Sequence, residues 1–259
     1  MIVLKPCFQT AIIMSIELLS IGEAARRMHL SIDTLRRWDK AGKFPAVKKS
    51  GKRFYRLEDI EKYLVKLGIA ETDIFEIAKE WVSIDSASEP SDSFYCQNSI
   101  VFQYRLKKLE NEIGVVAGLE DSFPLITSIV GEIGNNSFDH NLGNWPDVPG
   151  IFFGYDIRKR VIVLADRGQG ILKTLKRVKK ELASDEEALR VAFSEVISGR
   201  APEARGNWLK YVKGIIVEND VRLFFQTGTA VLELKKGDRS LNIRKERESI
   251  YGCIAVINF

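Results

Sequence analysis

Three oxygen-bearing side chains in the second half of the chain have the spacing of a cation site. Glu132, Asn136 and Asp139 are related as i, i+4 and i+7, so a helix would project all three from one narrow face. Carboxylate and amide oxygens are the ligands that Mg²⁺ prefers, together with several waters. The segment 132–141 is also poor in helix-forming residues, a cost that a purely structural helix has little reason to carry. These residues therefore predict a helix that binds a hard cation.

A strand end further along the chain supplies a second element of the same site. The apolar run 161–165 predicts a buried strand, and Asp166 follows it directly. Gly168 and Gly170 come next, and glycines allow a ligand to approach the backbone closely. Such a pattern alone is most often a simple turn. Because the helical stripe and this strand end occur together and in this order, they predict a nucleotide site with a purine beside Asp166.

The two segments resemble the N box and the G1 box of the Bergerat-fold ATPases. This superfamily contains gyrase, the ninety-kilodalton heat-shock chaperones, sensor histidine kinases and MutL. The resemblance covers roughly residues 100–259. It implies an α/β sandwich, in which a mixed sheet carries helices on one face, and it implies ATP and Mg²⁺ as cofactors.

The resemblance also implies a role for each matching residue. Asn136 and Glu132 would hold Mg²⁺, and Glu132 would act as the general base in a hydrolysing enzyme. Asp166 would accept a hydrogen bond from the adenine amino group. The other implied nucleotide-binding residues are Asp139, Gly168, Gly170, Gly206, Asn207 and Leu209.

Trp208 is the clearest departure from the family pattern. It stands where the second glycine motif of the family, matched in part by residues 205–209, usually has glycine. The indole ring would either fill an apolar slot and hold the lid, at about residues 171–208, in one state, or act as an ordinary core anchor. This departure favours nucleotide binding over fast hydrolysis.

A basic segment near the N-terminus indicates a different partner. Seven basic residues and no acidic one lie between Lys40 and Arg56, and such a block is typical of phosphate binding. Ser20 and Glu23 form a capping box that begins a short amphipathic helix. Ser31 caps a second helix that runs to about Lys40. Two short helices joined by a tight turn, the second bearing arginines, predict a helix-turn-helix.

The stretch 19–64 resembles the winged helix of the MerR and excisionase families. A β-hairpin wing over 48–56 and a third helix over 57–64 complete this pattern. The resemblance implies that the second helix enters the major groove of double-stranded DNA and that the wing contacts the backbone. The implied DNA-binding residues are Thr34, Arg36 and Arg37 on the helix, and Lys52, Arg53 and Tyr55 on the wing.

The 259 residues are enough for one substantial core and a second small one. We therefore predict an α+β protein with an extension at 1–18, the winged helix at 19–82, a polar linker at 83–99 and the ATP-binding domain at 100–259. A helix over 71–81 is expected to close the DNA-binding module. No apolar stretch is long enough to cross a bilayer, and three widely spaced cysteines argue against a disulfide framework or a zinc site. A cytoplasmic location is expected.

The combined prediction is a transcription regulator whose affinity for DNA or for a partner is switched by ATP and Mg²⁺. Slow hydrolysis through Glu132 remains a second hypothesis. A third is a serine/threonine kinase that resembles the anti-sigma-factor kinases and acts on a small regulatory protein. Autophosphorylation is least favoured, because neither His29 nor His140 lies on a helix suited to accept phosphate. A homodimer is a further expectation, although no coiled coil follows the winged helix.

Overall fold

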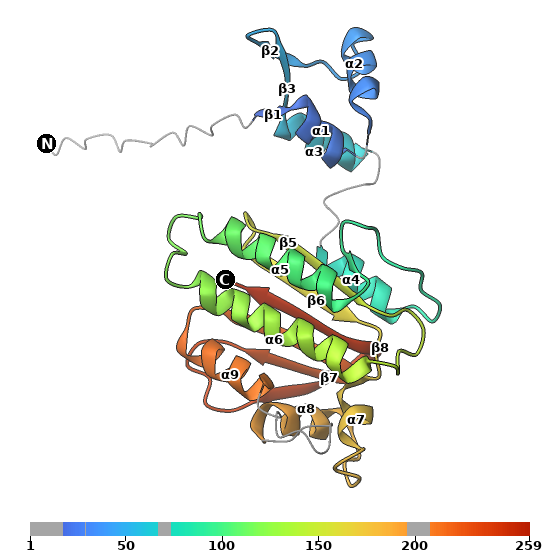
Figure 1. The fold of residues 1–259 in the computed structure, drawn as a ribbon, viewed down its shortest axis with the longest axis vertical. Helices are drawn as coiled ribbons and strands as arrows, with labels where there is room; N and C mark the ends of the chain where they lie inside the picture. Colours follow the sequence, from blue (N-terminus) through green and yellow to red (C-terminus); the bar gives the residue numbers. More distant parts are fainter. Residues whose placement is uncertain (1–17, 29, 67–73, 196–207) are drawn as a thin grey trace, which may run out of the picture. The chain divides into compact units, whose positions relative to one another are not determined.

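The computed structural model describes residues 18–28, 30–66, 74–195 and 208–259, and the chain divides into two compact units, 1–72 and 73–259 (Figure 1). The helices and the hairpin predicted for the first unit are confirmed. Its elements are β1 (Leu18–Ser20), α1 (Ile21–Arg27), α2 (Ile32–Lys40), β2 (Val47–Lys49), β3 (Lys52–Arg56) and α3 (Leu57–Lys66). The three strands form an antiparallel sheet in the order β1-β3-β2.

Local hydrogen bonds explain where the elements of the first unit begin and turn. The Ser20 amide donates to the Glu23 carboxylate at 2.8 Å, and the Glu23 amide donates back to the Ser20 hydroxyl. The Ser31 hydroxyl accepts the Thr34 amide at 3.1 Å and so caps α2. The wing turns at Gly51, whose φ of 74° belongs to the left-handed region that glycine adopts without strain. The small core is formed around Ala24, Leu35, Tyr55 and Ile60.

The second unit is built on a five-stranded sheet. Its strands are β4 (Tyr95–Cys96), β5 (Ile151–Asp156), β6 (Val161–Asp166), β7 (Arg222–Leu234) and β8 (Asn242–Asn258), in the order β4-β5-β6-β8-β7. Every neighbouring pair is antiparallel. The α+β class is therefore confirmed, whereas the mixed sheet implied by the family resemblance is wrong. Strand β7 is long and continuous, with register irregularities on both sides of Gly228.

Helices cover both faces of this sheet, not one as expected. The helices are α4 (Ile74–Ser83), α5 (Ser99–Ile113), α6 (Phe123–Asn141), α7 (Gly170–Leu175), α8 (Asp185–Ser194) and α9 (Trp208–Glu218). In Figure 1, α5 and α6 run side by side across one face, with α9 beside α6. On the other face, Ala78, Trp81 and Val82 of α4 pack against β5, β6 and β8.

Helix α4 therefore belongs to the second unit and does not close the DNA-binding module. Its apolar face of Ala78, Trp81 and Val82 is buried against the sheet, which explains the difference. Of the linker predicted at 83–99, residues 84–94 connect α4 to β4 as a loop inside the second unit. The Trp81 indole N–H holds this loop by donating to the Ser88 carbonyl at 2.9 Å.

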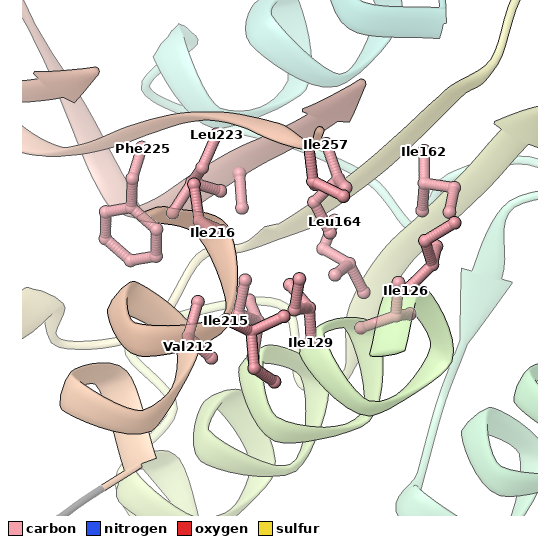
Figure 2. Packing of buried hydrophobic residues seen from close by; sticks show 14 of the residues in the cluster. Ile126, Ile129, Ile162, Leu164, Val212, Ile215, Ile216, Leu223, Phe225 and Ile257 are labelled. Carbon is pink, nitrogen blue, oxygen red and sulfur yellow. The ribbon is translucent and has the colours of Figure 1, made fainter. Parts of the chain in front are cut away.

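The largest core lies between the sheet and the helices α6 and α9. Figure 2 shows Ile126 and Ile129 of α6 and Val212, Ile215 and Ile216 of α9 in one core with side chains of β6, β7 and β8, with Ile129 closest to α9. Residues of β6 alternate between the two faces, so Ile162 and Leu164 join this core while Val163 joins the core under α4. None of the helices in the described part of the chain combines the length and apolar composition that a membrane span needs.

Close packing of α5 on α6 accounts for Gly134, one of the poor helix formers in the segment 132–141. A Cβ atom at Gly134 would collide with the ring of Phe102, which is fully buried on α5. The neighbouring Asn135 side chain accepts a hydrogen bond from Gln103 of α5 at 2.7 Å. Part of the helix-breaking composition of 132–141 therefore has a structural cause. The prediction that a structural helix has little reason to carry Gly134 is wrong.

Candidate functional site

A pocket lies on the face of the second unit that α6 covers, at the end of β6. Its empty space amounts to about 870 Å³, open solvent at the mouth included. Its walls are largely apolar, with side chains from α7, α8 and the sheet. Polar groups are supplied mainly by the last turns of α6 and by Asp166. The pocket therefore offers a ligand an apolar enclosure with a few fixed hydrogen-bonding groups.

Asp166 is the buried carboxylate of this pocket, and it is only 2% exposed. Its Oδ2 accepts the Ser137 hydroxyl at 2.7 Å, and its Oδ1 accepts the Gly168 amide at 2.8 Å. Burial raises its pKa to about 6, although the hydrogen bonds from Ser137, from the Gly168 amide and from the Cys253 amide oppose this rise. A buried ionised carboxylate is costly without partners, and these donors reduce that cost.

The glycines after Asp166 shape the pocket through their neighbours. A Cβ atom at Gly168 would collide with the Asn141 side chain, so this glycine lets the end of α6 approach the strand end. Gly170 lines the pocket and has a φ of 72°, which permits the sharp entry into α7. The Thr227 hydroxyl of β7 accepts the Ile171 amide at 3.1 Å and donates to the Gly252 carbonyl at 3.0 Å. The start of α7 is thereby fixed to the sheet.

The predicted stripe of α6 is helical as expected, but the pocket takes only one of its three residues. Asn136 lines the pocket, whereas Glu132 and Asp139 do not belong to its wall. Asp139 is exposed. Glu132 is half-buried, and this burial raises the pKa of its carboxyl. Of the three predicted oxygen ligands, the wall of this pocket therefore contains Asn136 and neither carboxylate.

The start of α9 forms a further part of the pocket wall. Leu209 lines the pocket as predicted, and Trp208 beside it lines the pocket as well. Because Trp208 is 39% exposed, the alternative that it is an ordinary core anchor is wrong. Gly206 and Asn207 lie outside the described residues.

Three polar residues that help to build this site, Ser137, Asn141 and Thr227, were not predicted from the sequence. Ser137 and Asn141 lie one turn apart on α6 and both reach Asp166, since the Asn141 amide lies 3.5 Å from Oδ1. Thr227 lies on β7, far from the others in sequence. The i, i+4 spacing of Ser137 and Asn141, next to the predicted stripe on the same helix, could have predicted both as site residues. For Thr227 the sequence offered none, since only the sheet topology brings it to this place.

Metal binding at this pocket would depend on few protein groups. Within residues 18–28, 30–66, 74–195 and 208–259, no three His, Cys, Asp or Glu side chains gather as a metal cluster. Asn136 is the predicted Mg²⁺ ligand that lines the pocket. Mg²⁺ is commonly held by one or two protein oxygens together with ligand phosphates and waters. Of the two predicted Mg²⁺ ligands, Glu132 and Asn136, the pocket wall thus contains only Asn136.

Arg167, the residue after Asp166, points to the opposite face of the sheet. Its guanidinium is fully buried and pairs with Asp147 at 2.5 Å. It also donates to the carbonyls of Trp81 and Ile84, at 2.5 and 2.9 Å, and it lies over the ring of Tyr251. These contacts satisfy carbonyls at the C-terminal end of α4. Arg167 therefore fixes α4 to the sheet.

The first unit presents a separate basic surface on α2 and the wing. Arg37 and Lys52 have exposed side chains. Arg36 is exposed as well and forms a 3.0 Å ion pair with Asp33 of the same helix. The Thr34 hydroxyl lies 2.9 Å from that of Ser31 at the start of α2. Four of the predicted DNA-binding residues are thus on or near the surface of the helix and wing.

The two other wing residues are engaged inside the module. Arg53 pairs with Asp39 of α2 at 2.6 Å, and the second oxygen of Asp39 accepts the Ala46 amide at 3.0 Å. These bonds, first that of Ala46, lower the pKa of Asp39. Tyr55 is 1% exposed, and its hydroxyl donates to the Leu35 carbonyl at 3.3 Å. This burial removes Tyr55 from the expected DNA-binding surface and gives it a structural role.

Comparison with known proteins identifies the class of the first unit. Residues 20–55 match the family described as MerR family regulatory protein. The first unit therefore carries a MerR-type helix-turn-helix, a DNA-binding domain of a kind that supports a role in transcription regulation. No curated protein matches the chain. The match ends at residue 55, before the second unit begins.

Proposed function

We propose that the chain is a DNA-binding transcription regulator whose second unit binds ATP with Mg²⁺, and that this binding changes its affinity for DNA or for a small protein partner. The MerR-type domain supports the DNA-binding half of this proposal. The resemblance of residues 132–140 and 166–170 to the N and G1 boxes of Bergerat-fold ATPases supports the ATP half. The pocket joins these two segments at one place.

The observation that carries the proposal is the buried carboxylate of Asp166 in the wall of the pocket. A carboxylate accepts hydrogen bonds and donates none while it is ionised. The exocyclic amine of adenine is a donor, whereas guanine carries a carbonyl oxygen at the corresponding position. Asp166 is thus suited to select adenine over guanine. Its ordered donors, Ser137 and the Gly168 amide, hold the carboxylate in one orientation before the ligand binds.

Binding is favoured over fast turnover by the position of Glu132. Asn136 would hold Mg²⁺ through its amide oxygen, and the metal would neutralise phosphate charge. Glu132 lies outside the pocket wall, so it is poorly placed as a general base for a ligand in this pocket. ATP would then act on the protein mainly by binding to it, and not by being hydrolysed. Slow hydrolysis and phosphate transfer to a partner are the outcomes that the test must separate from this one.

The test compares ATP and GTP on the purified full chain by calorimetry, with and without Mg²⁺. ATP should bind and GTP should bind poorly. Asp166→Asn should weaken ATP by at least about tenfold, because a hydrogen bond to a charged group is worth about 1.5–3 kcal/mol. Equal affinities for ATP and GTP would contradict the assignment.

A second measurement separates the switch from an enzyme. Phosphate release and DNA affinity are followed with and without ATP. If phosphate is released, the Glu132→Ala variant tests whether Glu132 is the general base. Loss of a general base lowers the hydrolysis rate by about 10²–10⁴ and changes the affinity for ATP little. A shift in DNA affinity without phosphate release supports the switch. Transfer of label to a co-purifying protein supports a kinase instead.

A further inference from the structure

Trp208 is an aromatic side chain that lines the pocket without a ring partner among the described residues. It begins α9 and is 39% exposed. The other tryptophans are each engaged by neighbours: Trp38 by Tyr63 and Lys43, Trp81 by Phe152 and the Ser88 carbonyl, and Trp145 by Phe138. Trp208 also stands outside the hydrophobic clusters of the described residues, whereas Leu209 beside it packs on the main core.

The position of this ring complements the polar groups of the pocket. Hydrogen-bonding groups come from α6 and from Asp166, while the start of α9 contributes Trp208 and Leu209. A large exposed apolar ring in a pocket wall is costly to leave in water and gains when a ligand covers it. The faces of aromatic side chains also attract the flat rings of bases, and such stacking tolerates any base.

We infer that Trp208 packs its indole ring against the planar ring system of the ligand. The pocket then holds a heteroaromatic ring in place through hydrogen bonds from its polar wall and through contact with the face of an indole. This inference rests on the proposed function and names the base as the part of the nucleotide that Trp208 recognises. The contact is not one that the family resemblance implies, because the resembling proteins have glycine at this position.

The experiment measures adenosine and ATP binding to the full chain by calorimetry for wild type, Trp208→Phe and Trp208→Leu. Phenylalanine keeps an aromatic face, so the affinities of Trp208→Phe for adenosine and ATP should stay within about threefold of wild type. Leucine keeps an apolar side chain but no aromatic face, and it should weaken both ligands by about tenfold, since stacking on one aromatic side chain is worth about that much or more. Equal weakening of adenosine and ATP shows that the loss concerns the base.

Tryptophan fluorescence gives an independent reading of the same contact. Ligand should change the emission of wild type and of the matched control Trp145→Phe, whose ring packs on Phe138 outside the pocket wall. Trp208→Phe should bind ligand and lose this change. Thermal unfolding of each variant verifies that it is folded.

Distinct outcomes overturn the inference and the proposed function. If the wild type binds adenosine and ATP, but Trp208→Leu binds both equally well, the inference fails and the proposed function stands. Persistence of the fluorescence change in Trp208→Phe also overturns the inference alone. If the wild type binds neither ligand, the proposed function fails, and the inference that rests on it fails too.

Discussion

Asp166 is a single carboxyl group that titrates close to neutral pH in the folded chain, with a pKa of about 6 caused mainly by burial. Its ordinary value is about 3.9. Because the folded pKa is raised, protonation stabilises the fold, and this contribution is complete below about pH 4 and lost as the pH rises to about 6. Without a ligand, the ionised carboxylate of Asp166 therefore destabilises the folded protein at pH 7. A donor from a ligand would relieve that cost.

A pH dependence of ligand binding follows from this residue. Only the ionised form of Asp166 is a charged acceptor, so adenosine should bind about tenfold more weakly at pH 5 than at pH 7.5, in proportion to the ionised fraction. Adenosine is used because it has no phosphate to titrate. Calorimetry over this range gives the answer, and Asp166→Asn should show a flat profile. A flat profile in the wild type would contradict the role of Asp166.

At this scale the sequence identified part of the site. Asn136, Asp166, Gly170 and Leu209 were predicted and do line the pocket. Sequence spacing also placed Glu132 in the site, because helical geometry alone does not say how far along a helix face the pocket extends. The groups that hold Asp166 could be found only once α6 and the end of β6 were brought together in space.

At the scale of elements, replacing Gly134 by alanine where α5 packs on α6 has two opposing effects on stability, one from helix propensity and one from packing. Alanine in a helix interior is favoured over glycine by about 1 kcal/mol. Overpacking a tight core costs about 1–3 kcal/mol, and the Phe102 ring cannot easily move, because it also packs edge-on against Phe153. We therefore expect Gly134→Ala to lower the free energy of unfolding by about 1 kcal/mol in urea titrations.

Gly214 of α9 provides the matched control. It is also a helical glycine, but a Cβ atom there meets nothing within 4 Å. Gly214→Ala should raise the free energy of unfolding by about 0.5–1 kcal/mol. A stabilising effect of both substitutions would show that α5 and α6 are not closely packed at Gly134.

The wing gives a second prediction for an element. Lys52 is exposed, so Lys52→Ala should reduce the salt dependence of DNA binding by about 0.9 in slope, the loss of one phosphate contact, without changing stability. Arg53 ties the wing to α2 through Asp39, so Arg53→Ala should also destabilise the module, by up to about 1 kcal/mol. Salt titrations and thermal unfolding of both variants separate these roles. The interpretation of Arg53 fails if the two variants behave alike.

Sequence predicted the elements of the first unit closely because capping residues and turns are local signals, as at Ser20, Ser31 and Gly51. It did less well with the sheet of the second unit. Strand order and direction depend on pairings between distant residues, such as β6 with β8. The apolar pattern of α4 likewise indicated a buried helix face without saying which domain buries it.

For the whole molecule, the proposed switch has a thermodynamic requirement. If ATP changes the affinity for DNA by some factor, DNA must change the affinity for ATP by the same factor, and such factors are usually about 5–150. We expect the two factors, measured on the full chain by fluorescence anisotropy and calorimetry, to agree. Asp166→Asn should remove the effect of ATP on DNA, while Lys52→Ala should weaken DNA binding and leave ATP affinity in the absence of DNA unchanged. Two independent affinities, each unaffected by the other ligand, would exclude the switch.

Asp166 and Arg167 are consecutive residues that serve opposite faces of one sheet. Asp166 belongs to the pocket, whereas Arg167 holds the last carbonyls of α4, the first described element of the second unit. A ligand that steadies the first residue restrains the backbone of the second. The amides of the last turn of α4 should therefore exchange their hydrogens with solvent more slowly when the pocket is filled, although the ligand does not touch this helix. Hydrogen exchange at α4 would thus show whether the pocket on the opposite face of the sheet is occupied.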